Sequence, residues 1–162
     1  GCGFGYPTTA IASRFKAATI VGVDYHPRSV EEARRTAQVA GVGDRVAFAV
    51  AAATDLPGSN YDLVTLFDSL HDFGDPLAAL RAARAVLAPG GAVLVCDNDA
   101  AEQVVDNLNP VGRMYYAVST LICTPNALSQ QGPGEPSHSG RTPVPRGSRR
   151  SPARQALRGR PG

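Results

Sequence analysis

Short apolar runs alternate with longer segments of helical periodicity along the first 129 residues. The apolar runs, which predict β-strands, lie at residues 19–23, 45–51, 61–67 and 92–96. The segments between and after them, which predict helices, lie at residues 6–17, 29–40, 77–87 and 110–122. Such alternation predicts an α/β fold with a mostly parallel sheet and helices on both of its faces. The run at 61–67 is apolar almost throughout, so we expect it to be buried on both faces.

Helix-start and helix-stop residues support these boundaries. Ser29 with Glu32 forms a capping-box pattern, and Gly41 ends the same predicted helix. Asp75 precedes Pro76, and Asn109 precedes Pro110, so each polar residue is expected to cap a helix that begins with proline.

The charge of the chain is divided unequally. Residues 1–129 carry 9 Lys and Arg against 13 Asp and Glu, whereas residues 130–162 carry 7 Arg and one acid. This tail also has 6 Pro and 6 Gly and no aromatic residue, so we expect it to be disordered. The composition matches an off-frame reading of GC-rich coding sequence, and we expect a frameshift near Gln130. A nucleic-acid-binding module that uses the tail is the alternative.

Three cysteines bound the chemistry. Cys2, Cys96 and Cys123 are odd in number and far apart, so we predict neither a disulfide framework nor a metal site. The absence of a disulfide pattern favours a reducing, cytoplasmic location. No apolar run approaches the roughly 18 residues of a membrane span, so no membrane partner is expected.

A glycine loop precedes the first predicted helix. Gly1, Gly3 and Gly5 follow a G-x-G-x-G pattern, which lets a ligand approach the backbone closely beside a helix start. The dinucleotide fingerprint is G-x-G-x-x-G, and Tyr6 occupies the position of its third glycine. This disfavours a nicotinamide-dependent oxidoreductase, which is the second alternative function. Asp24 ends the next strand, 19 residues after Gly5, and its carboxylate can accept ribose hydroxyls. A tight turn and a solvated acid are the alternatives without a ligand.

Five motifs then occur in order: GCGFG, VGVDYHPRSVEEAR, ATDLP, YDLVTLFDSLHDFGDP and LAPGGAVLVCD. Together they resemble class I S-adenosylmethionine (SAM)-dependent methyltransferases of the bacterial small-molecule type. The resemblance implies a Rossmann-like SAM-binding domain over residues 1–129 that transfers a methyl group from SAM to a small molecule. It also implies that the family's first strand and terminal antiparallel strand pair are absent. An inactive or merely SAM-binding remnant is therefore the first alternative.

The resemblance also assigns residues to the cofactor. The glycines would line its methionine part, Asp24 would hold the ribose, and Tyr25 would lie beside the adenine. Thr54 and Asp55 would lie at the adenine edge, and Phe67 and Asp68 would lie beneath the cofactor. The implied set is Gly1, Gly3, Gly5, Asp24, Tyr25, Thr54, Asp55, Phe67 and Asp68. Asp55 as a turn acid and Phe67 as a core residue are the alternatives.

Two residues are candidates on the acceptor side. His71 follows the strand at 61–67 and titrates near neutrality, so it can take a proton from the acceptor. The alternative is that it shapes or caps the loop before Asp75. Tyr115 lies on the apolar stripe of the last helix and is expected to pack in the core, whereas Tyr116 lies off the stripe and is the expected substrate contact. The sequence does not distinguish an oxygen, nitrogen or carbon acceptor, and it does not reveal the oligomeric state.

Overall fold

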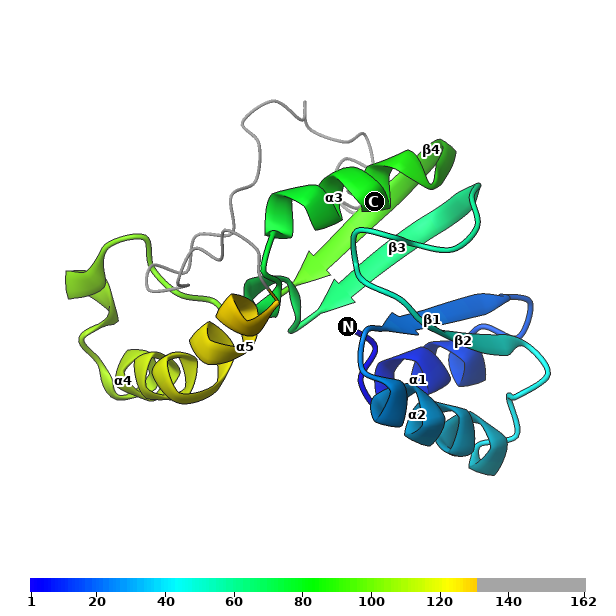
Figure 1. Ribbon diagram of the computed structural model, residues 1–162, viewed down its shortest axis with the longest axis horizontal. Helices are drawn as coiled ribbons and strands as arrows, with labels where there is room; N and C mark the ends of the chain where they lie inside the picture. The colour runs from blue at the N-terminus through cyan, green and yellow to red at the C-terminus, as the bar shows by residue number, and fades with distance from the viewer. Residues whose placement is uncertain (131–162) are drawn as a thin grey trace, which may run out of the picture.

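The strands form two parallel pairs in the computed structural model, which describes residues 1–130 (Figure 1). β1 (Ile20–Asp24) pairs with β2 (Val46–Val50), and β3 (Tyr61–Phe67) pairs with β4 (Leu87–Cys96). Within the described residues no strand joins the two pairs, so β1 and β3 each keep one edge without a strand partner. The predicted α/β class with parallel strands is confirmed, in an incomplete sheet.

Two helices cover the β1–β2 pair and form the main core with it. α1 (Tyr6–Arg14) and α2 (Pro27–Val39) pack on both strands and on each other (Figure 1). The shared feature of the core is small or branched apolar side chains around one aromatic ring. Its members are Ala12, Val30, Ala33, Ala37, Val42, Val46 and Phe48.

The β3–β4 pair is less well covered. α3 (Pro76–Ala85) lies along it, and the short helix η1 (Leu70–Asp72) connects β3 to α3 (Figure 1). The expectation that β3 is buried on both faces is wrong, because Leu63 is 51% exposed and Leu66 is the one residue of this strand that is buried. The cause is the single partner: β3 contacts β4 on one edge and no strand on the other within the described residues.

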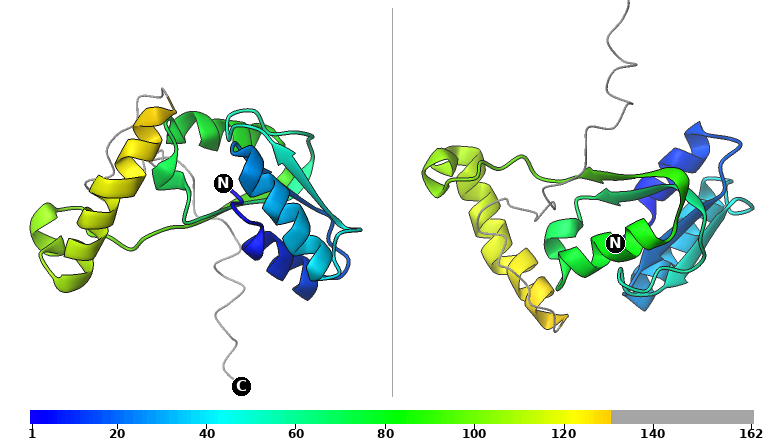
Figure 2. Two further views of the ribbon diagram at one scale, coloured as in Figure 1. Left: turned by 60° about the horizontal axis from the view of Figure 1, so that its bottom comes forward. Right: turned by 90° about the horizontal axis from the view of Figure 1, so that it is seen from above.

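The last described segment is a row of short helices. η2 (Val104–Asn107) leads to α4 (Pro110–Val118), and a π-helical turn, η3 (Ser119–Cys123), joins α4 to α5 (Thr124–Ser129). η2 and α4 lie away from both strand pairs, whereas α5 comes back beside η1 (Figures 1 and 2). The predicted stripe is exposed rather than core: Met114 is 54% and Ile122 62% exposed, and Tyr115 is only partly buried.

Local capping decides where the helices begin. Asp75 and Asn109 cap α3 and α4 as predicted, accepting from the amides of Ala78 and Gly112 at 2.8 and 2.9 Å. The prediction that Ser29 and Glu32 form a capping box is wrong. His26 caps α2 instead, because its Nδ1 accepts from the Ser29 amide at 3.3 Å.

Several boundaries differ from the predictions, and three of them concern the first three helices. α1 ends at Arg14 rather than residue 17, α2 begins at Pro27, and Leu87 belongs to β4 rather than to α3. The predicted disorder of the tail concerns residues that, apart from Gln130, lie outside the described ones. Among residues 1–130, no helix has the length and apolarity needed to cross a membrane.

Candidate functional site

The glycine loop lies against the carboxyl end of β1. The nitrogens of Gly1 and Cys2 both donate to the Val23 carbonyl, at 2.9 and 2.8 Å. The Gly3 amide donates to Oδ2 of Asp24 at 2.9 Å. The structure therefore brings together the two elements that the sequence analysis linked, a glycine turn and a strand-end carboxylate.

Gly5 and Gly3 of the loop differ in the space around them. Gly5 has a φ of 77°, and a Cβ there would lie 2.9 Å from that of Ala33, so close packing of α1 against α2 requires glycine. Gly3 has a φ of 52° and would place its Cβ in open space. A ligand can approach the backbone at Gly3 without displacing a side chain, which is the feature that a cofactor cradle needs.

Asp24 is held firmly but keeps acceptor capacity. Asp24 is only 8% exposed, and its Oδ1 accepts a hydrogen bond from the His26 amide at 3.0 Å. An ionised carboxylate offers about four lone-pair sites, so one on each oxygen remains for ribose hydroxyls. Tyr25, the next residue, is 49% exposed, and its hydroxyl donates to Asn126 Oδ1 of α5 at 2.9 Å.

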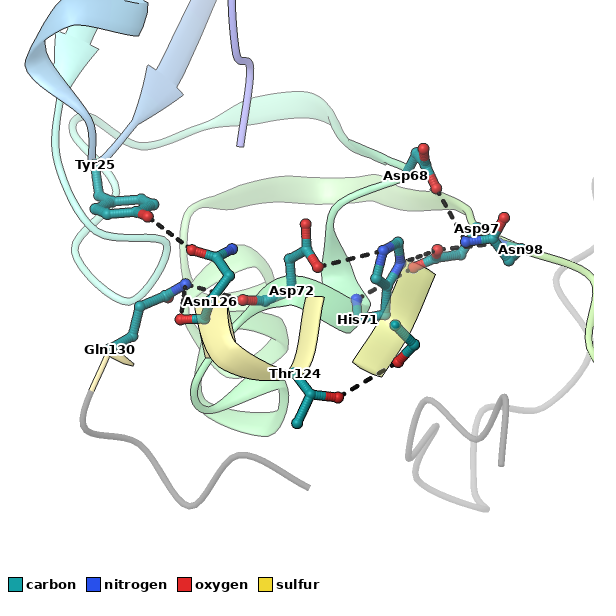
Figure 3. A network of polar contacts seen from close by, with 10 residues as sticks. Tyr25, Asp68, His71, Asp72, Asp97, Asn98, Thr124, Asn126 and Gln130 are labelled. Carbon is teal, nitrogen blue, oxygen red and sulfur yellow. Dashed lines mark hydrogen bonds and ion pairs between the residues drawn. The ribbon is translucent and has the colours of Figure 1, made fainter. Parts of the chain in front are cut away.

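A second polar group lies where β3 and β4 end. The His71 Nδ1 donates a short hydrogen bond to Asp97 Oδ1, and the His71 amide lies 3.4 Å from Asp97 Oδ2 (Figure 3). The side chains of His71 and Asp97 are 15% and 13% exposed. His71 is therefore fixed by a carboxylate at the end of the neighbouring strand, and this contact ties the loop before Asp75 to the end of β4.

The two partners shift each other's titration. The hydrogen bond to Asp97 raises the pKa of His71 above its ordinary value, although burial opposes this. Burial acts to raise the pKa of Asp97, but the hydrogen bonds from His71 and Asn98 outweigh it and hold that pKa below its ordinary value. Because Nδ1 carries the proton donated to Asp97, the neutral ring leaves Nε2 as the basic nitrogen.

Asp72 and Cys123 surround that nitrogen. Asp72 Oδ1 lies 3.4 Å from His71 Nε2 but makes no hydrogen bond among the described residues. Burial, together with the nearby Asp72 carboxylate, raises the pKa of the Cys123 thiol to about 11. His71, Asp72 and Cys123 place their ligand atoms within 4.8 Å of one another, as do Asp68, His71 and Asp97, so either trio could hold a metal ion.

The remaining predicted residues are less clearly assembled. Thr54 and Asp55 are exposed on the loop after β2, whose first residue donates its amide to the Asp24 carbonyl at 3.0 Å. Phe67 is partly buried in β3, and Asp68 has a φ of 47° and accepts from Asn98.

The last two predicted residues are Gly1, at the start of the chain, and Tyr116, in α4. Gly1 approaches the loop after β3, since a Cβ on it would lie 2.8 Å from that of Ser69. Tyr116 has a buried hydroxyl without a hydrogen-bond partner among the described residues. That hydroxyl keeps Tyr116 a candidate for a polar contact with a ligand.

Sequence reasoning missed the partners of His71. Asp97 directly follows β4, but the sequence analysis gave it no role. Parallel strands end at the same edge of a sheet, so a His just after β3 and an Asp just after β4 should have been expected to meet. Cys123 and Asn126 gave no comparable signal, because nothing local indicates that α5 returns to the site.

Comparison with known proteins identifies the family. A family model described as a methyltransferase domain matches residues 1–136. The 27-O-demethylrifamycin SV methyltransferase of Amycolatopsis mediterranei is 33% identical over 129 residues, covering 75% of this chain and 47% of that protein. The ubiquinone biosynthesis O-methyltransferase of Cereibacter sphaeroides is 31% identical over 96 residues, covering 59% and 38%. The chain thus spans about half or less of the length of these curated relatives.

Solved structures agree on the fold. The [4+2]-cyclase SpnF is 30% identical with a TM-score of 0.57, over 64% of this chain and 38% of that one. The YcgJ protein of Bacillus subtilis is 27% identical with a TM-score of 0.59, over 75% and 58%. Since the family model covers well over half of its residues, this chain belongs to the class I SAM-dependent methyltransferase family.

Proposed function

We propose that the protein to which this chain belongs transfers the methyl group of SAM to a hydroxyl group of a small molecule. The observation that carries the proposal is the hydrogen bond from the Gly3 amide to the buried Asp24 carboxylate. It joins the glycine turn to the acid one βα unit later, which is the arrangement that holds a nucleoside at the carboxyl end of parallel strands.

The residues present fit the cofactor. Asp24 would accept the ribose hydroxyls, and the open space at Gly3 would admit the methionine part. Tyr25, half-exposed beside Asp24, would flank the adenine, with Thr54 and Asp55 at its edge. Phe67 and Asp68, at the end of β3, would lie beneath the cofactor. Gly1 and Gly5, which shape the loop, would line its methionine part together with Gly3.

On the acceptor side, His71 is the candidate base. When bound, SAM supplies a methyl group already activated by its sulfonium, so no protein nucleophile is required. Positioning contributes much of the rate in such a reaction, up to about 7–11 kcal/mol in favourable cases. His71 would take the proton of the acceptor hydroxyl at Nε2, while Asp97 holds the ring and stabilises its charged form.

Two features support an oxygen acceptor. A hydroxyl must lose a proton as it is methylated, and the His71–Asp97 pair offers a base for that proton. The names of two relatives also specify methylation at oxygen. The neighbouring structure of a cyclase shows that this fold also supports other chemistry, so the acceptor has to be tested directly.

The test separates cofactor binding from transfer. Calorimetric titration of SAM into the protein should show binding, and Asp24→Asn should weaken it about 10-fold or more, because a charged acceptor of hydrogen bonds is lost. His71→Gln should leave SAM affinity within about twofold while abolishing methyl transfer from labelled SAM to a panel of hydroxylated aromatic and polyketide acceptors.

Each assay has an outcome that contradicts the proposal. Unchanged SAM affinity in Asp24→Asn would refute the ribose assignment. Full transfer activity in His71→Gln would refute the base. SAM binding without transfer to any acceptor in the panel would instead favour a binding remnant. Arg113→Gln, on the exposed part of α4, serves as the matched control for both assays.

A further inference from the structure

The helix α5 touches both sides of the proposed site. Its Asn126 accepts from the Tyr25 hydroxyl at 2.9 Å, next to the ribose-binding carboxylate (Figure 3). One turn later, Gln130 reaches the loop after η1: its Nε2 donates to the Asp72 carbonyl at 2.9 Å, and its Oε1 lies 3.4 Å from the Gly74 amide. One short helix therefore spans from the cofactor side to the His71 loop.

These contacts are polar and specific, and few apolar contacts support them. Ala127 is the one residue of α5 that is fully buried within the described part of the chain. Leu128, on the same helix, is 55% exposed, and Leu121 and Ile122 of the preceding turn are 77% and 62% exposed. The place of α5 thus depends on its hydrogen bonds, so removing one of them should loosen the helix as a whole.

A π-helical turn separates α5 from α4. Residues Ser119–Cys123 depart from α-helical hydrogen bonding, and such turns are enriched at functional sites. At the end of this turn, the Cys123 sulfur lies within 4.8 Å of a carboxylate oxygen of Asp72 and of a ring nitrogen of His71, which brings the turn beside the His71 loop.

We propose that Asn126 and Gln130 are positioning residues that make α5 a clasp between the two sides of the site. Asn126 sets the ring of Tyr25 against the adenine, and Gln130 sets the backbone around Asp72 beside His71. Cofactor binding and the order of the His71 loop are then coupled, and the coupling is reciprocal. This inference rests on the proposed function, because it assumes that Tyr25 flanks a nucleoside.

The clasp itself can be tested without a ligand. Tyr25→Phe removes only the hydroxyl that bonds Asn126. If α5 transmits order, this change should raise the amide exchange rate of Gly74 about two- to tenfold, the range expected for loss of one neutral hydrogen bond. Asn126→Ala should do the same, and Ser129→Ala, whose hydroxyl bonds only within α5, should not. An unchanged Gly74 rate in both Tyr25→Phe and Asn126→Ala overturns the clasp.

Positioning of the cofactor is tested by a double-mutant cycle on SAM affinity. Tyr25→Phe and Asn126→Ala should each weaken SAM binding about two- to tenfold, and the double variant no more than either alone. Gln130→Ala should weaken SAM binding similarly, although the hydrogen bonds of Gln130 within the described residues go to Asp72, Gly74 and Asn126. Gln130→Glu, which keeps an acceptor for Gly74, should recover part of the loss.

The outcomes distinguish this inference from the proposed function. Additive effects of Tyr25→Phe and Asn126→Ala, or no effect of Gln130→Ala, contradict the positioning role even if SAM binds well. If the unaltered protein binds no SAM, the proposed function and the role of Tyr25 both fail. The exchange rate of Gly74 still decides in that case whether α5 is a clasp.

Discussion

At the scale of single residues, the proposed base His71 and its partner Asp97 would carry the chemistry of the acceptor side. Neither residue has a sequence pattern of its own, and their partnership arises because β3 and β4 are parallel neighbours that end together. The sequence supports Asp24 and the glycine loop as candidates, because their roles follow from chain spacing. It could not supply Asp97, since that role depends on the register of two strands.

The raised pKa of His71 predicts how methyl transfer depends on pH. The ring can act as a base only when neutral, so the rate should rise with pH through the raised pKa of His71. Asp97→Asn removes the charge that stabilises the protonated ring, so it should lower that pKa and move the rising limb to lower pH. The same change should reduce the maximal rate, because the ring loses its orientation.

Methyl-transfer rates of the unaltered protein and of Asp97→Asn, measured as a function of pH, check this prediction. Cys96→Ser, on the adjacent exposed residue of β4, is the control and should leave the limb in place. A limb that stays in place, or moves to higher pH, in Asp97→Asn would show that His71 is not the titrating base.

At the scale of elements, local chemistry predicts helix starts only when the cap is of a common type. Asp75 and Asn109 were predictable because each precedes a proline and has a short acceptor side chain. His26 was not, since an imidazole ring is a rare cap and Ser29 with Glu32 offered a commoner pattern one turn later. In the structure Glu32 bonds Arg35 on the exposed face of α2 instead.

The cap of α2 makes a prediction that separates the two patterns. His26→Ala should lower the free energy of unfolding by about 0.5–2 kcal/mol, as for other lost caps, and His26→Asn should retain most of it. Glu32→Ala should cost little, because it removes one exposed ion pair. Denaturant unfolding measures all three; a larger loss in Glu32→Ala than in His26→Ala would restore the capping box.

At the scale of the whole molecule, the two strand pairs differ in how well they are buried. The β1–β2 pair shares a compact core with α1 and α2, whereas Leu63, Leu94 and Val95 of the β3–β4 pair are exposed. An apolar sequence shows that a strand is able to be buried, but its neighbours decide whether it is. That is why the run at 61–67 was located to the residue and yet its burial was predicted wrongly.

This difference predicts weak and uneven stability for the 162-residue chain. Fully burying one large aliphatic side chain contributes about 1.5–3 kcal/mol, and several such side chains remain exposed. We expect a broad thermal transition below about 50 °C, within or below the usual range of mesophile domains. Amides of β2 should exchange more slowly than those of β3. A single sharp transition above about 50 °C, with equal protection, would contradict this.

The two hydrogen bonds from backbone amides to Asp24 have a consequence for which nucleosides the proposed site would accept. Each carboxylate oxygen already accepts one backbone N–H, which fixes the direction of the lone pairs that would accept from the ribose in the proposed function. A 2′- or 3′-deoxy analogue would leave one of them buried and without a donor, and rejection of such an analogue exceeds what the lost contact alone would give. Selection for an intact sugar would then reside in two peptide groups, which no side-chain substitution in the loop removes.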